Sequence, residues 1–136
     1  VTLVCGPTSQ PLPAGVNAIR VTSAADMYEA CMQTFPDNDI AVMCAAVADY
    51  TISNPATQKI KKDNSSLVLE LEKTKDILKA MGEQKKRNQV LVGFALETNN
   101  EKEYALKKLS SKKADMIVLN SLNDPGAGFG SGWRSH

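Results

Sequence analysis

Short apolar runs alternate with helical patterns along most of this 136-residue chain, and this alternation constrains the fold more than any other feature. Five runs are apolar at nearly every position, which is typical of strands covered on both faces, as in a parallel sheet. They are Val1–Val4, Ile19–Val21, Ile40–Val47, Val90–Phe94 and Met116–Leu119. We therefore expect these five segments to be buried strands.

Three segments between these runs carry apolar residues at helical spacing. They are Ser23–Thr34, Asp76–Arg87 and the stretch from Asn99 or Asn100 to Lys113. The first opens with a serine that can cap a helix, and the second ends in basic residues that favour the helix dipole. Strands that alternate with helices predict an α/β fold, a Rossmann-like three-layer sandwich with a mainly parallel sheet and helices on both faces.

One segment departs from this alternation. Lys59–Lys62 and Leu67–Lys73 flank the polar turn Asp63–Ser66, and leucine occupies positions 67, 69 and 71. Alternation of this kind indicates a strand with two different faces. We expect a protruding antiparallel flap hairpin built from these two strands.

The charge and hydrophobicity of the chain argue against two classes of binding partner. Sixteen basic and fifteen acidic residues give a formal net charge of +1, and no apolar run approaches the roughly 20 residues that a membrane span needs. Neither a nucleic acid nor a membrane is expected as a partner. The amino-terminal run has no signal-peptide pattern, so the expected location is the cytoplasm.

The cysteine and histidine content excludes further classes of site. Cys5, Cys31 and Cys44 are odd in number and widely spaced, which argues against a disulfide framework and a zinc site. Core packing is the expected role of each. The only histidine is His136 at the end of the chain, so histidine catalysis is not expected.

Both ends of the sequence depart from a complete fold of this class. The chain opens directly in a predicted buried strand, so we expect the first βα unit of the fold to be missing. Trp133–His136 follows a glycine-rich stretch and has no strand or helix pattern. We expect residues 1–130 to form a domain fragment and residues 131–136 to be a remnant of cloning.

Two residues stand where ligands bind in open α/β sheets, near the carboxyl ends of strands. Asp49 follows the predicted strand Ile40–Val47, and its carboxylate could bind ribose hydroxyls or hydrated magnesium. An aspartate that only ends a strand, with no ligand, would give the same sequence pattern. Phe94 follows Gly93 and could stack on a nucleobase, although a core phenylalanine is commoner.

Two pairs of lysines could meet phosphates as point charges. Lys59 and Lys61 alternate on one face of a predicted strand, and Lys108 and Lys112 are four apart on one helical face. Lysines in solvent are the commoner explanation of either pattern. The sequence has no Walker loop, no dinucleotide glycine fingerprint and no nucleophile elbow.

Four motifs in this order resemble the phosphopantothenoylcysteine synthetase (phosphopantothenate–cysteine ligase) family. They are Cys44–Tyr50 (CAAVADY), Lys59–Lys62 (KIKK), Gly93–Asn100 (GFALETNN) and the pair Tyr104-Ala105. The similarity also includes Val1–Thr8 and Asn120–Phe129, so it covers the chain to about residue 130.

The resemblance implies an activity and a set of contacts. The family ligates 4'-phosphopantothenate to L-cysteine in coenzyme A biosynthesis, using CTP and Mg2+ and passing through an acyl-cytidylate. Lys59 is the implied catalytic residue, and no metal ligand is assigned. The implied nucleotide contacts are Ala46, Asp49, Lys59, Lys75, Asp76, Ile77, Leu78, Phe94, Lys108 and Lys112.

The resemblance also implies partners for this chain, and the sequence departs from the family's pattern at several places. Family members form homodimers, and many bacterial forms are fused to an FMN-dependent decarboxylase. This chain lacks the family's preceding strand, its Gly-Pro-Thr-type loop and its Asn-His-Ser-Ser-Gly stretch, and Lys75 stands where relatives commonly have proline. We therefore expect the fragment to be impaired. Two alternatives stay open, namely a nicotinamide-dinucleotide-binding Rossmann module and a folded dimerisation core without a ligand.

Overall fold

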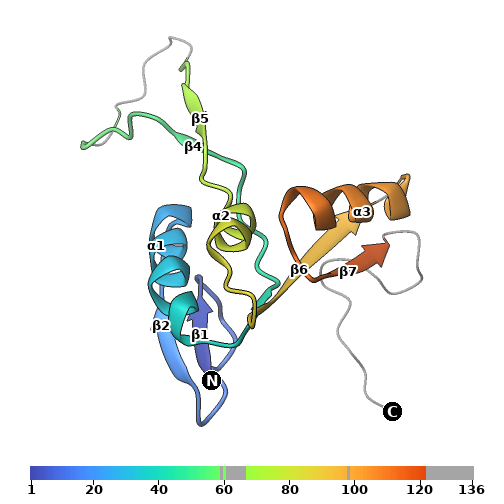
Figure 1. Ribbon diagram of the computed structural model, residues 1–136. Helices are drawn as coiled ribbons and strands as arrows, with labels where there is room; N and C mark the ends of the chain where they lie inside the picture. The colour runs from blue at the N-terminus through green and yellow to red at the C-terminus, as the bar shows by residue number, and fades with distance from the viewer. Residues whose placement is uncertain (59, 61–66, 98, 122–136) are drawn as a thin grey trace, which may run out of the picture.

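The computed structural model describes residues 1–58, 60, 67–97 and 99–121 (Figure 1). Within them the helices are α1 (Ala24–Thr34), α2 (Ile77–Gln84) and α3 (Glu101–Ser111), with a 3-10 turn η1 at Phe35–Asp37. The strands are β1 (Thr2–Cys5), β2 (Asn17–Arg20), β3 (Ile40–Met43), β4 (Tyr50–Ile52), β5 (Leu71–Lys73), β6 (Val90–Glu97) and β7 (Met116–Ser121).

The expected α/β class with a mainly parallel sheet is confirmed. Strands β3, β6 and β7 form a parallel sheet in that order, with Ile40 opposite Val90 and Val92 opposite Met116. Strands β1 and β2 form a second parallel pair. Within the described residues no strand hydrogen bonds join β1 to β3, so the parallel strands form two pieces rather than one sheet.

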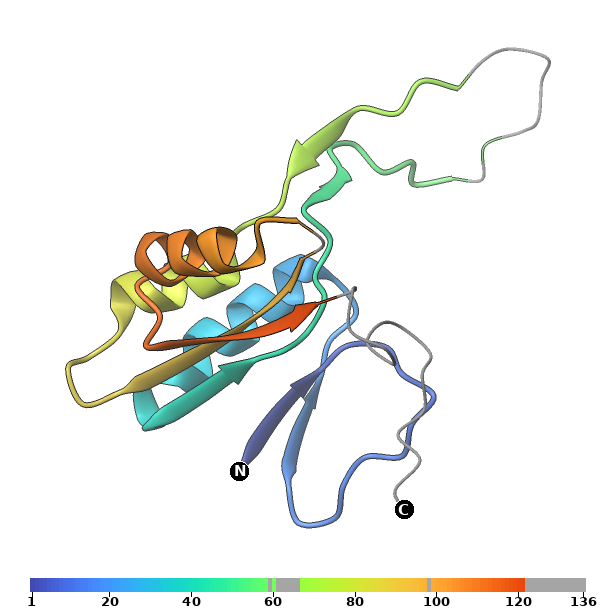
Figure 2. The ribbon, with the colours of Figure 1, turned by 90° about the vertical axis from the view of Figure 1, so that its right-hand side faces the viewer.

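The described helices lie on one face of the β3–β6–β7 sheet, whereas we expected helices on both faces (Figure 2). Gly93 marks the covered face, because a Cβ added there would lie 2.7 Å from Leu78 Cδ2 of α2. Ile40, Val42 and Met116 point the other way, and their exposed fractions are 63%, 56% and 56%. In this part of the chain the sheet has one covered and one open face.

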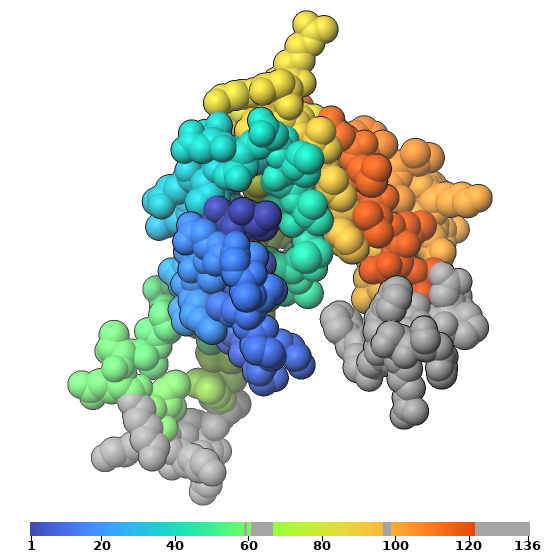
Figure 3. Space-filling view, turned by 90° about the horizontal axis from the view of Figure 1, so that it is seen from below, coloured from blue at the N-terminus to red at the C-terminus, as the bar shows by residue number. Residues whose placement is uncertain are grey.

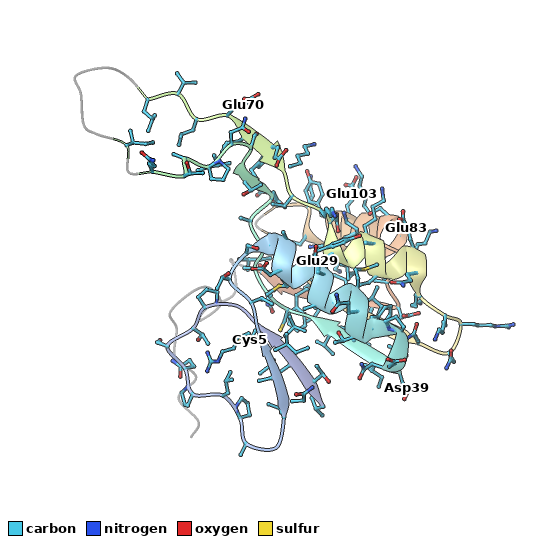
Figure 4. The ribbon with its side chains drawn as sticks, turned by 90° about the vertical axis from the view of Figure 1, so that its left-hand side faces the viewer. Cys5, Glu29, Asp39, Glu70, Glu83 and Glu103 are labelled. Atoms are coloured by element: carbon cyan, nitrogen blue, oxygen red, sulfur yellow. The ribbon has the colours of Figure 1, made fainter. Side chains whose placement is uncertain are left out.

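The core lies between α1, α2 and the covered face of the sheet. Its most buried members include Phe35 at 2% exposure, Met81 at 2% and Leu91 at 0%. Truncating a side chain such as Leu91 to alanine costs about 2–5 kcal/mol in typical cores. Each of the three helices carries an exposed acidic side chain, namely Glu29, Glu83 and Glu103 (Figure 4).

The cysteines share this core only in part. Cys31 is buried in it, and burial raises the pKa of its thiol. Cys5 is half-buried, and Cys44 is exposed, so the expected core role was wrong for Cys44. None of the helices in the described ranges is long and apolar enough to cross a membrane.

Helix α1 begins as its sequence predicts. Ser23 is its N-cap and forms a capping box, in which the Asp26 N–H donates to Ser23 Oγ over 3.1 Å and the Ser23 N–H donates to Asp26 Oδ2 over 2.9 Å. The bonds from Ser23, followed by those from Thr22, lower the pKa of Asp26. Such a cap typically contributes about 1 kcal/mol.

Helix α2 is shorter than the predicted Asp76–Arg87. Asp76 is its N-cap, and the helix ends at Gln84 because Lys85 has an extended ψ of 131°. The chain then turns, with the Lys86 N–H donating to the Gln89 side-chain oxygen. Gln89 Nε2 in turn donates to the carbonyl oxygens of Phe35 and Asn38, which ties this turn to η1.

The first site-bearing strand also ends earlier than expected. Strand β3 stops at Met43, opposite Gly93, rather than at Val47. Residues 44–49 leave the sheet, and all of them except Val47 are exposed. Alanines at 45, 46 and 48 offer little side-chain surface to hold this stretch in a buried strand.

The flap hairpin exists, but its strands differ from the prediction. Strand β4 pairs antiparallel with β5, with Tyr50 opposite Lys73 and Ile52 opposite Leu71. The pairing continues only to Ser53, whose N–H donates to the Glu70 carbonyl oxygen, and the described residues 67–70 form no strand. Of the predicted Lys59–Lys62 strand, the structure describes only residue 60, which is not in a strand. The hairpin projects away from the helices (Figures 1 and 2).

Gly82→Ala is expected to destabilise the protein, although alanine normally stabilises a helix interior over glycine by about 1 kcal/mol. A Cβ at position 82 would lie 1.8 Å from the backbone oxygen of Lys112, so α2 and the end of α3 must separate. We expect a loss of at least about 1–3 kcal/mol in the free energy of unfolding, measured by urea titration.

The exposed Glu83→Ala in the same helix is the matched control and should change this free energy by less than about 0.5 kcal/mol. If Gly82→Ala proved as stable as the wild type, the close approach of α2 to Lys112 would be contradicted.

Candidate functional site

A pocket of about 520 Å³ opens at the carboxyl ends of β3 and β6, beside the first turn of α2. This is the edge at which open α/β sheets bind ligands. Five parts of the chain line it, namely the end of β3 with the stretch after it, the stem of the hairpin, the start of α2, strand β6, and the end of α3 with its C-cap. The lining residues are Met43, Ala45, Val47, Ala48, Asp49, Tyr50, Lys73, Thr74, Lys75, Asp76, Ile77, Leu78, Phe94, Lys108 and Lys112.

Most of the predicted contact residues meet in this pocket. Eight of them line it, and they are Asp49, Lys75, Asp76, Ile77, Leu78, Phe94, Lys108 and Lys112. Ala46 is exposed and is not among the lining residues, although its neighbours Ala45 and Val47 are. Lys59 lies outside the described residues. The pocket therefore brings together predicted contact residues from positions 49 to 112. It does not test the role of Lys59, the predicted catalytic residue.

The first turn of α2 is fixed by one polar and two apolar contacts. Asp76 Oδ1 accepts a hydrogen bond of 2.9 Å from the Lys79 N–H, which caps the helix. Ile77 is 6% exposed and packs in the core, and Leu78 lies over Gly93. These contacts hold the positive end of the α2 dipole at the pocket, where it favours an anion.

Two lysines of α3 and its C-cap reach the same pocket. Lys108 Nζ donates to the Phe94 carbonyl oxygen over 2.9 Å, and Lys112 Nζ forms an ion pair with the Asp76 carboxylate. The Lys112 side chain is 24% exposed. Both ammonium groups are thus held at the rim by protein oxygens rather than extended into solvent.

This environment shifts the pKa of the Asp76 carboxylate. Burial alone would raise its pKa, but the hydrogen bonds from Lys112 and the Lys79 N–H, together with the charges of Lys112 and Lys108, outweigh burial. The pKa of Asp76 is therefore lowered below its ordinary value. At neutral pH the carboxylate offsets one of the positive charges at the pocket.

Thr74 joins the hairpin stem to the pocket, and sequence reasoning missed it. Its N–H donates to the Asp49 carbonyl oxygen over 2.9 Å, and its Oγ1 donates to the Ala48 carbonyl oxygen over 2.7 Å. The next residue, Lys75, places Nζ 4.6 Å from the centre of the Tyr28 ring on α1, a cation–π contact. A lone threonine in a polar segment carries no motif that could have identified it.

The arrangement suits a polyphosphate. Lys73, Lys75, Lys108 and Lys112 line the pocket together with a helix N-terminus, while Asp76 is the partner of one of them. In the described ranges no cluster of three or more histidine, cysteine, aspartate or glutamate side chains could hold a metal ion. Magnesium usually binds through one or two carboxylates plus substrate phosphates, so Asp49 with a bound polyphosphate fits that ion.

The fold and the pocket define a Rossmann-like α/β domain with a lysine-lined site at the carboxyl edge of its sheet. The family described as "DNA/pantothenate metabolism flavoprotein C-terminal domain" matches residues 1–134. The chain belongs to this family.

Curated relatives agree with this assignment. The coenzyme A biosynthesis bifunctional protein CoaBC of Bacillus subtilis is 47% identical over 96% of this chain and 32% of its own length, and that of Escherichia coli is 39% identical over 96% and 33%. A protein named cysteine/cysteine sulfinic acid decarboxylase, from an unknown prokaryotic organism, is 52% identical over 96% of this chain and 36% of its own length. The chain spans about a third of these relatives.

Solved structures match the fold. The crystal structure of the C-terminal domain of CoaBC is 44% identical, with a TM-score of 0.75, and the match covers 88% of this chain and 55% of that one. The DNA/pantothenate metabolism flavoprotein of Streptococcus pneumoniae has a TM-score of 0.73 at 22% identity, which is a likeness of fold alone.

Asp76→Asn is expected to lower the free energy of unfolding at neutral pH, because Lys112 loses its ionic partner. The Asp76 pKa is lowered in the folded state, so its contribution is present above the unfolded pKa and disappears as the pH falls through the folded pKa. The difference between variant and wild type should therefore shrink below about pH 4 in urea titrations.

Glu29→Gln, on the exposed face of α1, serves as the control for loss of one carboxylate. A difference between Asp76→Asn and the wild type that stayed constant from neutral to acidic pH would rule out the ion pair as its source.

Proposed function

We propose that this domain binds CTP in the lysine-lined pocket and belongs to a phosphopantothenate–cysteine ligase of coenzyme A biosynthesis. The observation that carries the proposal is the convergence of Lys108, Lys112 and the first turn of α2 on one pocket at the carboxyl edge of the sheet. A triphosphate needs positive charge from several directions, and these three elements supply it.

The proposed reaction has two steps. The carboxylate of 4'-phosphopantothenate attacks the α-phosphate of CTP, which forms an acyl-cytidylate and expels pyrophosphate. The amine of L-cysteine then attacks the acyl carbon, so an amide bond forms, CMP leaves, and the amine loses a proton. Attack by an anion on a polyphosphate needs charge neutralisation and alignment more than a protein nucleophile.

The residues of the pocket divide these tasks. Lys108 and Lys112 would neutralise the phosphates, and the N–H groups at the start of α2 would orient them. Asp49 would accept from the ribose or hold hydrated magnesium that enters with the nucleotide. Lys59 is the proposed catalytic residue on the resemblance alone. The half-buried Phe94 is the candidate to contact the base.

The proposal extends to the longer protein of which such a domain forms part. Homodimerisation and fusion to an FMN-dependent decarboxylase are proposed from the family resemblance, and the printed name of the B. subtilis and E. coli relatives, a bifunctional protein, is in line with fusion. The decarboxylase name of the third relative describes a protein of which this chain spans 36%, so we do not transfer that reaction to this domain. The comparisons favour neither a nicotinamide-dinucleotide module nor a ligand-free core.

CTP with magnesium is expected to raise the melting temperature of this chain by several degrees more than NAD does. A ligand that binds only the native state at about 100 times its Kd adds about 2.7 kcal/mol to the free energy of unfolding. Lys108→Ala should reduce the CTP shift, because Lys108 Nζ lies at the pocket. The measurement is thermal unfolding at fixed ionic strength with CTP, ATP or NAD.

Lys107→Ala is the matched control, because Lys107 is the exposed neighbour on the same helix and is not among the lining residues. It removes the same charge from the molecule and should leave the CTP shift unchanged. If both variants lost the same part of the CTP shift, the effect would come from net charge rather than from a contact in the pocket. An NAD shift as large as the CTP shift would refute the nucleotide assignment.

A further inference from the structure

A tyrosine outside the lysine-lined pocket contacts one of the pocket's lysines. Lys75 lines the pocket, and its Nζ lies 4.6 Å from the centre of the Tyr28 ring. Tyr28 belongs to α1 and is not among the lining residues. At this distance an ammonium group is attracted by the electron-rich face of an aromatic ring. An effect of Tyr28 on a ligand in the pocket therefore has to pass through Lys75.

The core holds the ring, so the position of the ring does not depend on the lysine. Tyr28 is half-buried and packs against the core cluster, next to the buried Met27. The Ser23 capping box fixes the start of the same helix. Lys75, in contrast, is exposed and lies just before the N-cap of α2, and a free lysine side chain samples many rotamers. The fixed ring thus restricts the ammonium group, and not the reverse.

Lys75 is held from the side of the molecule opposite to the other lysines of the pocket. Helix α2 lies between α1 and α3, and it contacts α1 on one side and the backbone of Lys112 on the other (Figure 1). Seen from below, the blue and light-blue amino-terminal residues, which include α1, are likewise far from the orange residues of α3 (Figure 3). Lys108 and Lys112 belong to α3 and its C-cap. The positive charge at the pocket is therefore held from two sides.

The partner of Lys75 also differs in kind from the partners of Lys108 and Lys112. The Asp76 carboxylate offsets the charge of Lys112, and the Phe94 carbonyl oxygen accepts a hydrogen bond from Lys108. An aromatic ring carries no net charge, so its contact with Lys75 offsets none of the lysine's charge. The ammonium group has three N–H donors, and those directed away from the ring remain available to an anion.

We propose that Tyr28 is a positioning residue, which holds the Lys75 ammonium group where it binds the polyphosphate chain of the ligand. The inference rests on the proposed function of the pocket and deepens it, because it names the phosphate chain as the part of the nucleotide that this pair recognises. The ammonium group keeps the ring on one side and donates to phosphate oxygens on the other. Because the ring restricts it before the ligand arrives, less side-chain entropy is lost on binding.

The proton chemical shift of the Lys75 ε-methylene group tests the contact directly. Protons over the face of an aromatic ring are shielded, so this signal should lie upfield of the corresponding signals of exposed lysines such as Lys107. The upfield shift should persist in Tyr28→Phe, disappear in Tyr28→Leu and remain when the pocket is saturated with inorganic tripolyphosphate. A signal that is unshifted in the wild type, or that loses its shift on saturation, would overturn the positioning role.

Binding of inorganic tripolyphosphate, measured by calorimetry at fixed ionic strength, tests the consequence for the ligand. This probe has no base or sugar, so it reports on the phosphate contacts alone. Tyr28→Leu should weaken its binding by about two- to fivefold, and Tyr28→Phe, which keeps the ring, should bind it like the wild type. Tyr104→Leu is the matched control and should have no effect, because Tyr104 is an exposed tyrosine of α3 that is not among the lining residues.

A double-mutant cycle shows whether Tyr28 acts through Lys75. Lys75→Gln should weaken tripolyphosphate binding by at least about fivefold, whereas Lys107→Gln, which removes the same charge outside the pocket, should not. In the Lys75→Gln background, Tyr28→Leu should change the affinity by less than about twofold. If Tyr28→Leu does not fold, the Lys75→Gln affinity and the wild-type chemical shift at saturation decide.

Three binding results would overturn the proposal. They are wild-type affinity in Tyr28→Leu, an undiminished effect of Tyr28→Leu in the Lys75→Gln background, and no binding of tripolyphosphate at millimolar concentration. CTP is titrated in parallel. CTP binding that ignores both residues would overturn the positioning role and leave the nucleotide assignment standing. Tripolyphosphate binding that depends on both residues, without CTP binding, would support the positioning role and refute the nucleotide assignment.

Discussion

The close seating of α2 against its neighbours is the constraint on which the rest of the structure depends. Two glycines permit it, since Gly82 lies under the backbone oxygen of Lys112 and Gly93 lies under Leu78. A side chain at either position would force α2 away from the sheet or from the end of α3. Because α2 is held there, Asp76 reaches Lys112 and the first turn of α2 opens on the pocket.

The same seating sets the electrostatics of the pocket. Lys112 contacts α2 twice, through its backbone oxygen over Gly82 and through its ammonium group at Asp76. Lys108 is held by the Phe94 carbonyl oxygen of β6. A bound phosphate must compete with these protein oxygens for the two ammonium groups. Its affinity therefore depends on how much stronger the bonds from lysine to phosphate are than the bonds from lysine to protein that they replace. The present partners keep the lysines in place before a ligand arrives, which reduces the side-chain entropy lost on binding.

Sequence patterns predicted the element types well and their limits less well. The apolar runs, the Ser23 cap and the helical spacing are local signals, and each corresponds to an observed element. The strand predicted to reach Val47 ends at Met43, and the first hairpin strand is Tyr50–Ile52, because strand limits depend on partners distant in sequence. Which face of the sheet the described helices cover likewise depends on tertiary packing.

The residues of the pocket were likewise predictable only where the signal is local in sequence. Asp49, Lys108 and Lys112 could be predicted because they belong to motifs or spacings, and they line one pocket. Thr74 could not, because its role rests on bonds to the carbonyl oxygens of Ala48 and Asp49, which only the folded chain brings near. The Asp76–Lys112 ion pair joins residues 36 apart and was likewise invisible in the sequence.

Amide chemical shifts recorded during a titration with CTP and magnesium would show most directly whether the lysine-lined pocket binds the nucleotide, since they locate binding on the chain. We expect the largest changes at residues 45–49, 74–78, 94 and 108–112, which line or adjoin the pocket. Changes concentrated elsewhere, for example on α1 and β2, or none at saturating CTP, would contradict the assignment of this pocket as the nucleotide site.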